Sequence, residues 1–296
     1  MWTSTIGFGI PFFANRDYLR ETLGSLLQQS DEDWTAVVID DCSPEAGAAE
    51  IVAEIDDPRL RYVRNHHNLG IAANFDRCLA APGTGIVAVL HADDILEPGY
   101  VAAVRAAHAD RPDAAVFAPM VTVIGASGDP ASTVADRHKL RLWPRDQRID
   151  LSGDRGLARL MSGFFLYFPA FSYRITLLPR PAFDARWTQV MDVDLVARLL
   201  LDGGTILVDR TPLYRYRRHE GTMTAQNTKV FTRLREETDI AYEVMNAARA
   251  QGWTHTARAA RLHWSQRAGG LLAVASSLGR PAPGRTGALH DLVSIR

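Results

Sequence analysis

Two adjacent aspartates, Asp93 and Asp94, follow a short apolar segment at residues 86–90. An uninterrupted apolar run of this length predicts a strand that is buried on both faces of a sheet. Ligands of open α/β sheets bind beyond the carboxyl ends of the strands, which is where these carboxylates would lie. Neighbouring carboxylates repel each other, and their hard oxygens suit Mg²⁺ or Mn²⁺, so the pair predicts a divalent-cation site shared with substrate phosphates. The residues alone leave one alternative open, in which either aspartate caps a helix that begins near Glu97 and Pro98.

The N-terminal third of the sequence contains the elements that would position this pair. Apolar segments that predict strands lie at residues 6–10, 34–39, 61–63 and 86–90. One helix is expected after the N-cap Asn15, a second after Ser43 and the N1 residue Pro44, and a third from Ile71. Because strands that alternate with helices form βαβ units, we predict an α/β fold with a largely parallel sheet and right-handed crossovers.

The rest of the chain has a less regular pattern. Further helices are expected at residues 100–109, 191–201 and from 227 onward, and further strands within 114–124, 205–208 and 213–216. Residues 125–150 have no clean hydrophobic period and are too many for an ordinary connection, which predicts a mobile functional loop. Residues 164–176 are rich in aromatic side chains, which favours core or subunit packing, with an acceptor-binding platform as the alternative.

The composition excludes several classes of protein. The chain has 296 residues, of which 47% are apolar, and this is enough for a sizeable core. Its net charge is −1, so a nucleic-acid-binding role has no electrostatic support. Its two cysteines, Cys42 and Cys78, form neither a disulfide framework nor a zinc motif. No signal peptide is recognisable and no apolar run reaches the ~20 residues of a membrane span, so we expect a cytoplasmic protein.

Six short motifs, in their order and spacing, resemble family 2 glycosyltransferases of the GT-A fold. They are Ile-Pro-Phe-Phe-Ala-Asn-Arg at 10–16, Val-Ile-Asp-Asp-Cys-Ser at 38–43, Asn-Leu-Gly at 68–70, Leu-His-Ala-Asp-Asp at 90–94, Met-Asp-Val-Asp-Leu at 191–195 and Arg-Arg-His-Glu-Gly-Thr at 217–222. The resemblance covers residues 5–225. It implies a Rossmann-like, mostly parallel sheet flanked by helices. It also implies metal-assisted transfer of a sugar from a nucleotide-diphosphate donor to a hydroxyl acceptor, by single displacement with inversion.

The resemblance further implies which residues contact the nucleotide. Pro11, Phe12, Phe13 and Asp40 correspond to the walls around the base and ribose, where Asp40 would accept hydrogen bonds from a ring N–H or a hydroxyl. Asn68 corresponds to a turn beside the base.

This chain departs from the family pattern at two positions. Many members carry an arginine a few residues after the Asn-Leu-Gly motif, and we expect Asn74 to take the place of that arginine in this chain. Many members carry an acidic residue where this chain has His91, which would hydrogen-bond the ribose. By the same resemblance, Asp93 would contact the ribose or a metal-bound water, and Asp94 would bind Mn²⁺ or Mg²⁺ directly.

The later motifs imply the remaining site residues. Arg217 and Arg218 resemble the segment that closes over the diphosphate, since guanidinium groups bind phosphate oxygens well. His219 would be a third protein ligand of the metal, or else an ordinary histidine at a strand end. Asp192 matches the catalytic base, which takes the proton of the acceptor hydroxyl. For Asp194 we prefer a structural role, as a cap or as the partner of Arg198 four residues on.

Two other functions are weighed against a glycosyltransferase. A sugar nucleotidyltransferase would carry a glycine-rich basic loop after the first strand, and residues 11–16 contain no glycine. A non-catalytic nucleotide-sugar-binding protein would not need Asp93, Asp94 and Asp192 together. The expected donor is UDP-, dTDP- or GDP-linked, and the expected acceptor is a saccharide, a lipid-linked saccharide or a natural product.

The expected domains are a glycosyltransferase domain at residues 1–225 and a helical extension at 226–296. Within the first, residues 1–124 would bind the nucleotide sugar and residues 125–225 would bind the acceptor and carry the base. The last ~15 residues, with several Pro and Gly, are expected to be disordered. Residues 253–278 contain tryptophans beside arginines. They would pack on their own domain, on a second subunit in a homodimer, or on the inner face of a membrane as a peripheral contact.

Overall fold

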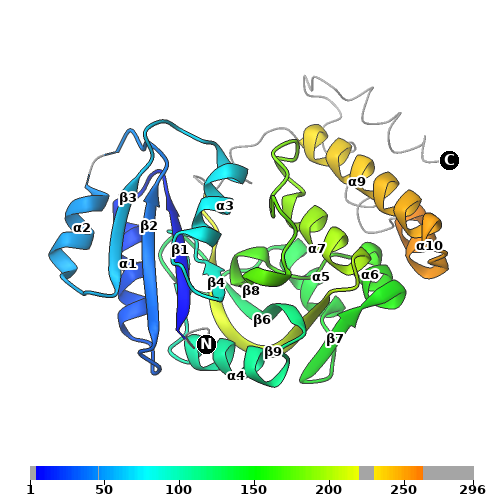
Figure 1. Ribbon diagram of the computed structural model, residues 1–296, viewed down its shortest axis with the longest axis horizontal. Helices are drawn as coiled ribbons and strands as arrows, with labels where there is room; N and C mark the ends of the chain where they lie inside the picture. Colours follow the sequence, from blue (N-terminus) through cyan, green and yellow to red (C-terminus); the bar gives the residue numbers. More distant parts are fainter. Residues whose placement is uncertain (1–4, 46, 220–229, 263–296) are drawn as a thin grey trace.

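The N-terminal half is the βαβ series that the sequence predicts. In the computed structural model, which describes residues 5–45, 47–219 and 230–262, strands β1 (Ile6–Phe12), β2 (Trp34–Asp40), β3 (Leu60–Arg64) and β4 (Ile86–Val89) alternate with helices α1 (Arg16–Leu27), α2 (Ala48–Ile55) and α3 (Ile71–Ala80). β1 pairs in parallel with β2 and β4, and β2 pairs in parallel with β3. The prediction of parallel pairing is therefore confirmed for this half (Figure 1).

The two faces of β1 explain how the helices pack. Ile6, Phe8 and Ile10 point to one face and are at most 1% exposed, in a core with Leu19, Leu23 and Leu26 of α1. The other face carries Gly9, where an added Cβ would lie 2.1 Å from the carbonyl oxygen of Cys78 in α3. A glycine is required here because α3 approaches the strand backbone this closely. Leu27, which lies eight residues after Leu19 and would share this apolar face by helical period, is 39% exposed.

The C-terminal half extends the same sheet with mixed pairing. Its elements are β5 (Ile95–Leu96), α4 (Tyr100–Asp110), β6 (Ala114–Ile124), α5 (Val134–Leu142), β7 (Arg148–Ser152), α6 (Gly153–Ser162), β8 (Ser172–Arg174), α7 (Met191–Leu201), β9 (Thr205–Arg217), α9 (Val230–Ala250) and α10 (Thr254–Leu262), with short 3₁₀ turns at Phe168–Ala170 and Ile175–Leu177. The nine strands of the described residues form one sheet in the order β3-β2-β1-β4-β8-β6-β9-β5, and β7 pairs with β9. β8 is antiparallel to both β4 and β6, whereas β6 and β9 are parallel. The central sheet flanked by helices is thus an α/β fold of the expected kind.

Two elements differ in their boundaries from the sequence prediction. α2 begins at Ala48 and not at Ser43, because the Ser43 hydroxyl donates to the carbonyl oxygen of Phe13 and holds the loop after β1. β9 is one strand where two were expected, and its pairing with β6 shifts in register between Pro119 and Met120. Most of the aromatic segment at residues 164–176 packs in the core, as the favoured interpretation predicted.

Residues 125–150 are not a loop, which corrects the prediction. They contain α5 and most of β7. α5 starts with a capping box, in which Thr133 Oγ1 accepts from the Asp136 N–H and the Asp136 carboxylate accepts from the Thr133 N–H. The same carboxylate accepts two hydrogen bonds from Arg218, of 2.6 and 2.9 Å, and one from the Tyr167 hydroxyl. The weak hydrophobic period of this segment hid a helix that is held mainly by polar contacts.

Asp136 gives a pH-dependent prediction for stability. Burial opposes its ionisation, but hydrogen bonds from Arg218, Thr133 and Tyr167 outweigh this and hold the pKa of the Asp136 carboxyl well below its usual range. A lowered folded-state pKa stabilises the fold above the unfolded value of ~3.9, and that stabilisation is lost as the pH falls below it. We expect Asp136→Asn to cost about 1–3 kcal/mol at pH 7. The difference from wild type should shrink by about 1 kcal/mol at pH 3 in urea unfolding, and a difference that does not change with pH would contradict this account.

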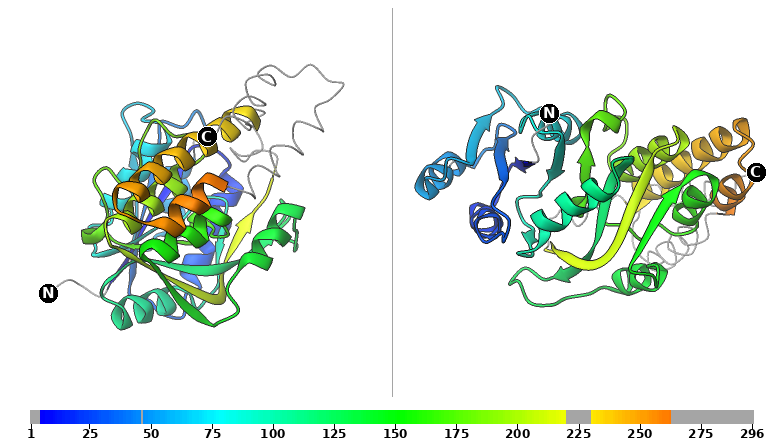
Figure 2. Two further views of the ribbon diagram at one scale, coloured as in Figure 1. Left: turned by 90° about the vertical axis from the view of Figure 1, so that its right-hand side faces the viewer. Right: turned by 60° about the horizontal axis from the view of Figure 1, so that its bottom comes forward.

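The C-terminal helices pack on other helices of the C-terminal half. α10 packs against α6 and α9 (Figure 2). Asp154 of α6 accepts hydrogen bonds from the N–H groups of His255 and Thr256. This placement supports intradomain packing for residues 253–262. The other part of the predicted interaction segment, 263–278, and the tail expected to be disordered lie outside the described residues. Among the helices that are described, none has the length and apolarity needed to cross a membrane.

Candidate active site

The aspartate pair lies at the carboxyl end of β4, as predicted, but Asp94 is not at an open strand tip. Its side chain is 0% exposed. The Arg217 N–H donates to Oδ1 at 2.7 Å, and the Tyr214 hydroxyl donates to Oδ2 at 2.8 Å. Burial, together with the charge of Asp93, raises the pKa of the Asp94 carboxyl well above its usual range. A nearby cation would restore its negative charge.

The helix-capping alternative for this pair is wrong. α4 begins at Tyr100, its N-cap is Gly99, and no side chain caps its first turn. Asp93 instead accepts a hydrogen bond of 2.9 Å from His219 Nε2, and 29% of its side chain is exposed. Both carboxylates are therefore available for a role other than helix capping.

His91 joins the two aspartates in a group that fits a metal ion. One ligand atom from each of His91, Asp93 and Asp94 lies within 4.8 Å of the others. A divalent ion held here would take the His91 nitrogen and carboxylate oxygens of Asp93 and Asp94 as ligands. His91 Nε2 is buried and has no hydrogen-bond partner among the described residues. Burial lowers the pKa of the His91 imidazole, which keeps the ring neutral and able to donate a lone pair.

Arg217 has a different position from the one expected of a diphosphate ligand. Its side chain is 0% exposed. Nε donates to the carbonyl oxygen of Asp93 at 2.7 Å, Nη1 donates to that of Ala126 at 2.9 Å, and Nη2 pairs with Glu21. The guanidinium also lies 4.5 Å from the centre of the Tyr18 ring. Because every face of the group is occupied by protein, Arg217 braces the turn that carries the aspartates.

This geometry predicts a large stability loss for Arg217→Met. Removal of the buried guanidinium leaves the Asp93 and Ala126 carbonyls without their donor, so we expect a cost of about 3–5 kcal/mol in urea unfolding. Arg215 is the matched control on the same strand, since it is 43% exposed and pairs with Glu97 at the surface. Arg215→Met should cost no more than about 1 kcal/mol. Equal losses in the two variants would show that Arg217 is not the brace described here.

Arg218 and His219 directly follow β9 and bond different carboxylates. Arg218 is 31% exposed and bonds Asp136 through Nε and Nη2. His219 contacts Asp93 through Nε2, and its ring centre lies 4.9 Å from that of Tyr18. The predictions that Arg218 contacts a diphosphate and that His219 binds the metal stay predictions. The structure adds that both residues are already positioned by carboxylates.

The residues predicted to surround the nucleotide have unequal access to solvent. Phe13 is 49% exposed, whereas Phe12 is 1% exposed and packs in the core, so the Phe12 side chain cannot form a wall of a nucleotide site in this conformation. Pro11 lies at the end of β1 and is partly buried. Asp40 is 0% exposed and accepts hydrogen bonds from the Ser43 N–H, the Tyr62 hydroxyl and Arg64, the last two on the same oxygen.

The Asn-Leu-Gly motif forms the turn before α3. Asn68 is exposed, and its Oδ1 accepts from the Gly70 N–H at 2.9 Å. Asp41 accepts from the N–H groups of Leu69 and Gly70, which fixes the turn beside β2. Asn74 is only 4% exposed and accepts from Asn65, so it lies beneath this turn. Its contact with a donor stays a prediction, and its burial gives that prediction no support.

Asp192 lies in the first turn of α7. Its Oδ1 accepts from the Val193 N–H at 2.9 Å. Burial raises the pKa of the Asp192 carboxyl, and the charges of Lys139 and Arg233 act in the opposite direction. A raised pKa suits a group that accepts a proton. Asp194 forms the predicted i,i+4 ion pair with Arg198, with an N–O distance of 2.7 Å, so its structural role is confirmed.

The sequence analysis missed several residues near the site. Tyr214, Glu21 and Tyr18 hold Asp94 and Arg217, and Lys139 donates to the carbonyl oxygen of Leu166 at 3.1 Å near Asp192. Tyr214 and Arg217 belong to one strand, but only the sheet order brings that strand beside Asp94. No local sequence signal could have paired them.

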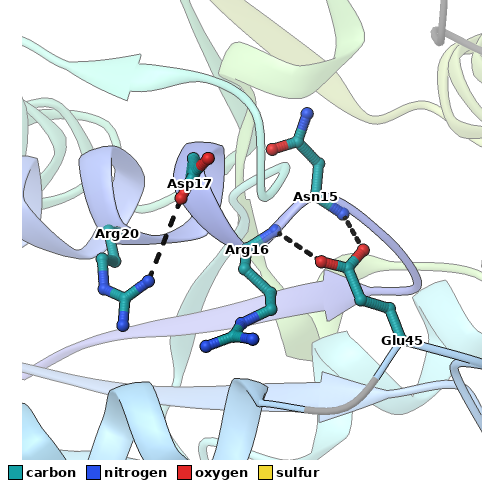
Figure 3. A pocket seen from close by; sticks show the side chains of 5 residues that line it. All are labelled: Asn15, Arg16, Asp17, Arg20 and Glu45. Atoms are coloured by element: carbon teal, nitrogen blue, oxygen red, sulfur yellow. Dashed lines mark hydrogen bonds and ion pairs between the residues drawn. The ribbon is translucent and has the colours of Figure 1, made fainter.

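A separate hollow lies at the start of α1 and carries no catalytic group (Figure 3). Asn15, Arg16, Asp17, Arg20 and Glu45 line it. Asn15 caps α1 as predicted, and the Glu45 carboxylate accepts from the N–H groups of Asn15 and Arg16 at 2.7 and 3.3 Å. The helix start is thus already occupied by a carboxylate of the protein.

Comparison with known proteins identifies the class that this fold and site define. The family model described as glycosyl transferase family 2 matches residues 8–172, more than half of the chain. The chain therefore belongs to glycosyl transferase family 2, and its fold is the GT-A fold.

Individual relatives are more distant. The succinoglycan biosynthesis protein ExoO of Rhizobium meliloti is 26% identical over 219 residues, which are 74% of this chain and 62% of that protein. This chain covers less than two thirds of the length of ExoO and of the other curated relatives that it matches. S. aureus TarS, solved in complex with UDP-GlcNAc, has a TM-score of 0.73 at 17% identity, covering 98% of this chain and 81% of that one. The mannosyltransferase PcManGT of Pyrobaculum calidifontis, solved with GDP-Man and Mn²⁺, has a TM-score of 0.59 at 15% identity, covering 96% and 78%. At these identities the two structures show the shared fold alone.

Proposed function

We propose that this chain transfers a sugar from a nucleotide-diphosphate donor to a hydroxyl acceptor by metal-assisted single displacement, with inversion at the anomeric carbon. The observation that carries the proposal is the group of His91, Asp93 and Asp94 at the carboxyl end of β4. Membership of glycosyl transferase family 2 supports the reaction class. The nucleotide sugars bound by TarS and PcManGT, and the Mn²⁺ bound by PcManGT, support the choice of donor and ion.

The two halves of the sheet would divide the work. The loops after β1 to β4, within residues 1–124, would hold the nucleotide sugar, with Pro11, Phe13 and Asn68 at the accessible surface. Residues 125–225 would hold the acceptor, and α9 and α10 belong to the helical extension expected at 226–296. An ion bound at the aspartates supplies positive charge that stabilises the departing diphosphate.

The protein's own groups would perform the remaining steps. Asp192 accepts the proton of the acceptor hydroxyl as its oxygen attacks the anomeric carbon, since a neutral hydroxyl is a poor nucleophile. The partly exposed guanidinium of Arg218 would bind diphosphate oxygens. Arg217 acts indirectly, because its guanidinium holds the carbonyl oxygen of Asp93 and its N–H holds the carboxylate of Asp94.

A panel of nucleotide sugars tests the donor assignment. The whole chain would be heated with Mn²⁺ and each of several UDP-, dTDP- and GDP-sugars, and its melting temperature followed. A donor present at 100 times its Kd should stabilise the folded state by about 2.7 kcal/mol. Sugars linked to one base should raise the melting temperature above that with Mn²⁺ alone. A chain that is stabilised by no member of the panel would contradict the proposal.

A further inference from the structure

The group at the end of β4 contains one nitrogen donor, His91, beside the two carboxylates of Asp93 and Asp94. We propose that His91 is a direct nitrogen ligand of the divalent ion, and that this ligand makes the site prefer a first-row transition ion such as Mn²⁺ over Mg²⁺. The inference rests on the proposed function for the presence of an ion at Asp93 and Asp94. It differs from the sequence-based expectation, in which His91 hydrogen-bonds a ribose.

The surroundings of His91 favour ligation over a structural role. A structural histidine in a protein interior normally has its ring nitrogens satisfied by hydrogen bonds. His91 Nε2 is buried without such a partner among the described residues, and the group's ligand atoms lie within 4.8 Å of one another. The ring centre lies 5.4 Å from that of Phe75 and 5.9 Å from that of Phe168. These two rings fix the imidazole without using its nitrogens.

His219 is the other imidazole in reach, and its contacts suggest a different task. Its Nε2 is 2.9 Å from Asp93 Oδ2, so it is already engaged with a carboxylate of the group. A histidine in this position orients the carboxylate that binds the ion. We therefore assign His91 as the nitrogen ligand and His219 as a positioning residue for Asp93.

The preference follows from ligand chemistry. Mg²⁺ favours oxygen ligands almost exclusively, whereas imidazole nitrogen binds well to later divalent ions of the first transition row. Replacement of an oxygen ligand by the His91 ring thus favours Mn²⁺, and Co²⁺ still more, relative to Mg²⁺.

The test measures metal binding to the intact chain without donor or acceptor. Pulsed electron paramagnetic resonance of bound Mn²⁺ detects coupling to a directly coordinated ¹⁴N nucleus, and calorimetric competition gives the ratio of Mn²⁺ to Mg²⁺ affinity. In the wild type we expect a nitrogen coupling. The His91→Gln variant should lose the coupling, and its Mn²⁺-to-Mg²⁺ affinity ratio should fall by about 10-fold or more. His91→Asp should behave in the same way, and metal-free thermal unfolding would confirm that at least one variant is folded.

His219→Gln is the matched control, and it should keep the nitrogen coupling. A coupling that survives in His91→Gln but disappears in His219→Gln would overturn the assignment. Binding of Mn²⁺ with no nitrogen coupling in the wild type would overturn this inference and leave the proposed function intact. Failure of Mn²⁺ to bind at all would overturn both the inference and the metal-assisted part of the proposed function.

Discussion

Replacement of Asp192 by asparagine is expected to lower sugar transfer by about 10²- to 10⁴-fold, because the amide cannot accept the proton of the acceptor hydroxyl. Asparagine keeps the shape of the side chain and its hydrogen bond from the Val193 N–H. Donor affinity should hardly change, since the candidate donor contacts at Phe13, Asn68 and the aspartate pair lie on other elements. The measurements are single-turnover transfer and donor binding in the two proteins.

The neighbouring Asp194 provides the control. It is 2% exposed and paired with Arg198, so Asp194→Asn should cost stability and leave transfer nearly unchanged. Normal transfer by Asp192→Asn beside an inactive, folded Asp194→Asn would place the base two residues later than proposed. Loss of donor binding in Asp192→Asn would show that this carboxylate is structural or metal-bound.

The rate of transfer should also fall as the pH is lowered, and this fall should begin at a pH above the usual pKa of an aspartate. Burial raises the pKa of Asp192, and only its ionised form can accept a proton. Because the charge of Lys139 acts to lower that pKa, Lys139→Met should move the acid limb of the pH–rate profile to higher pH. An unchanged limb would mean that Lys139 does not influence the base.

Removal of the divalent ion should have the second large effect. The diphosphate would then leave without neutralisation of its charge, which raises the barrier by several kcal/mol and slows transfer by about 10³-fold or more. Transfer in excess chelator should fall by this amount and recover when Mn²⁺ is returned. Full activity in chelator would exclude metal assistance.

The two aspartates should respond differently to substitution. Asp93 is 29% exposed, so Asp93→Asn should lose transfer with little loss of stability. Asp94 is enclosed by Tyr214 and Arg217, so Asp94→Ala should lose both transfer and several kcal/mol of stability. This corrects the expectation that Asp94 lies outside the core. An Asp94→Ala protein as stable as wild type would contradict the structure around it.

Local sequence signals were sufficient to predict those elements whose structure depends on their own residues and not on distant contacts. The Asn15 cap of α1 and the extent of α7 at Met191–Leu201 agree with the sequence prediction. The parallel pairing of β1 to β4 followed from βαβ connectivity. The motifs then placed Asp93 and Asp94 at the correct end of β4.

The remaining features depend on partners that are distant in the sequence. α5 looked like a loop because Asp136 is held by Arg218 and Tyr167, which a hydrophobic period cannot detect. Arg217 looked like a phosphate ligand because its residue type suits that role, but Glu21 and two backbone carbonyls enclose it. Ser43 looked like a helix cap because serine is a common capping residue. Only the fold shows that its hydroxyl instead donates to the carbonyl oxygen of Phe13.

The most direct test of the central claim needs no knowledge of the acceptor. The whole chain would be incubated with Mn²⁺ and the α-linked nucleotide sugar that stabilises it most, and slow donor hydrolysis followed by ³¹P and ¹H nuclear magnetic resonance. We predict release of the nucleoside diphosphate together with free sugar that appears first as the β anomer, before mutarotation. Release of a sugar 1-phosphate, or first appearance of the α anomer, would contradict an inverting glycosyltransferase.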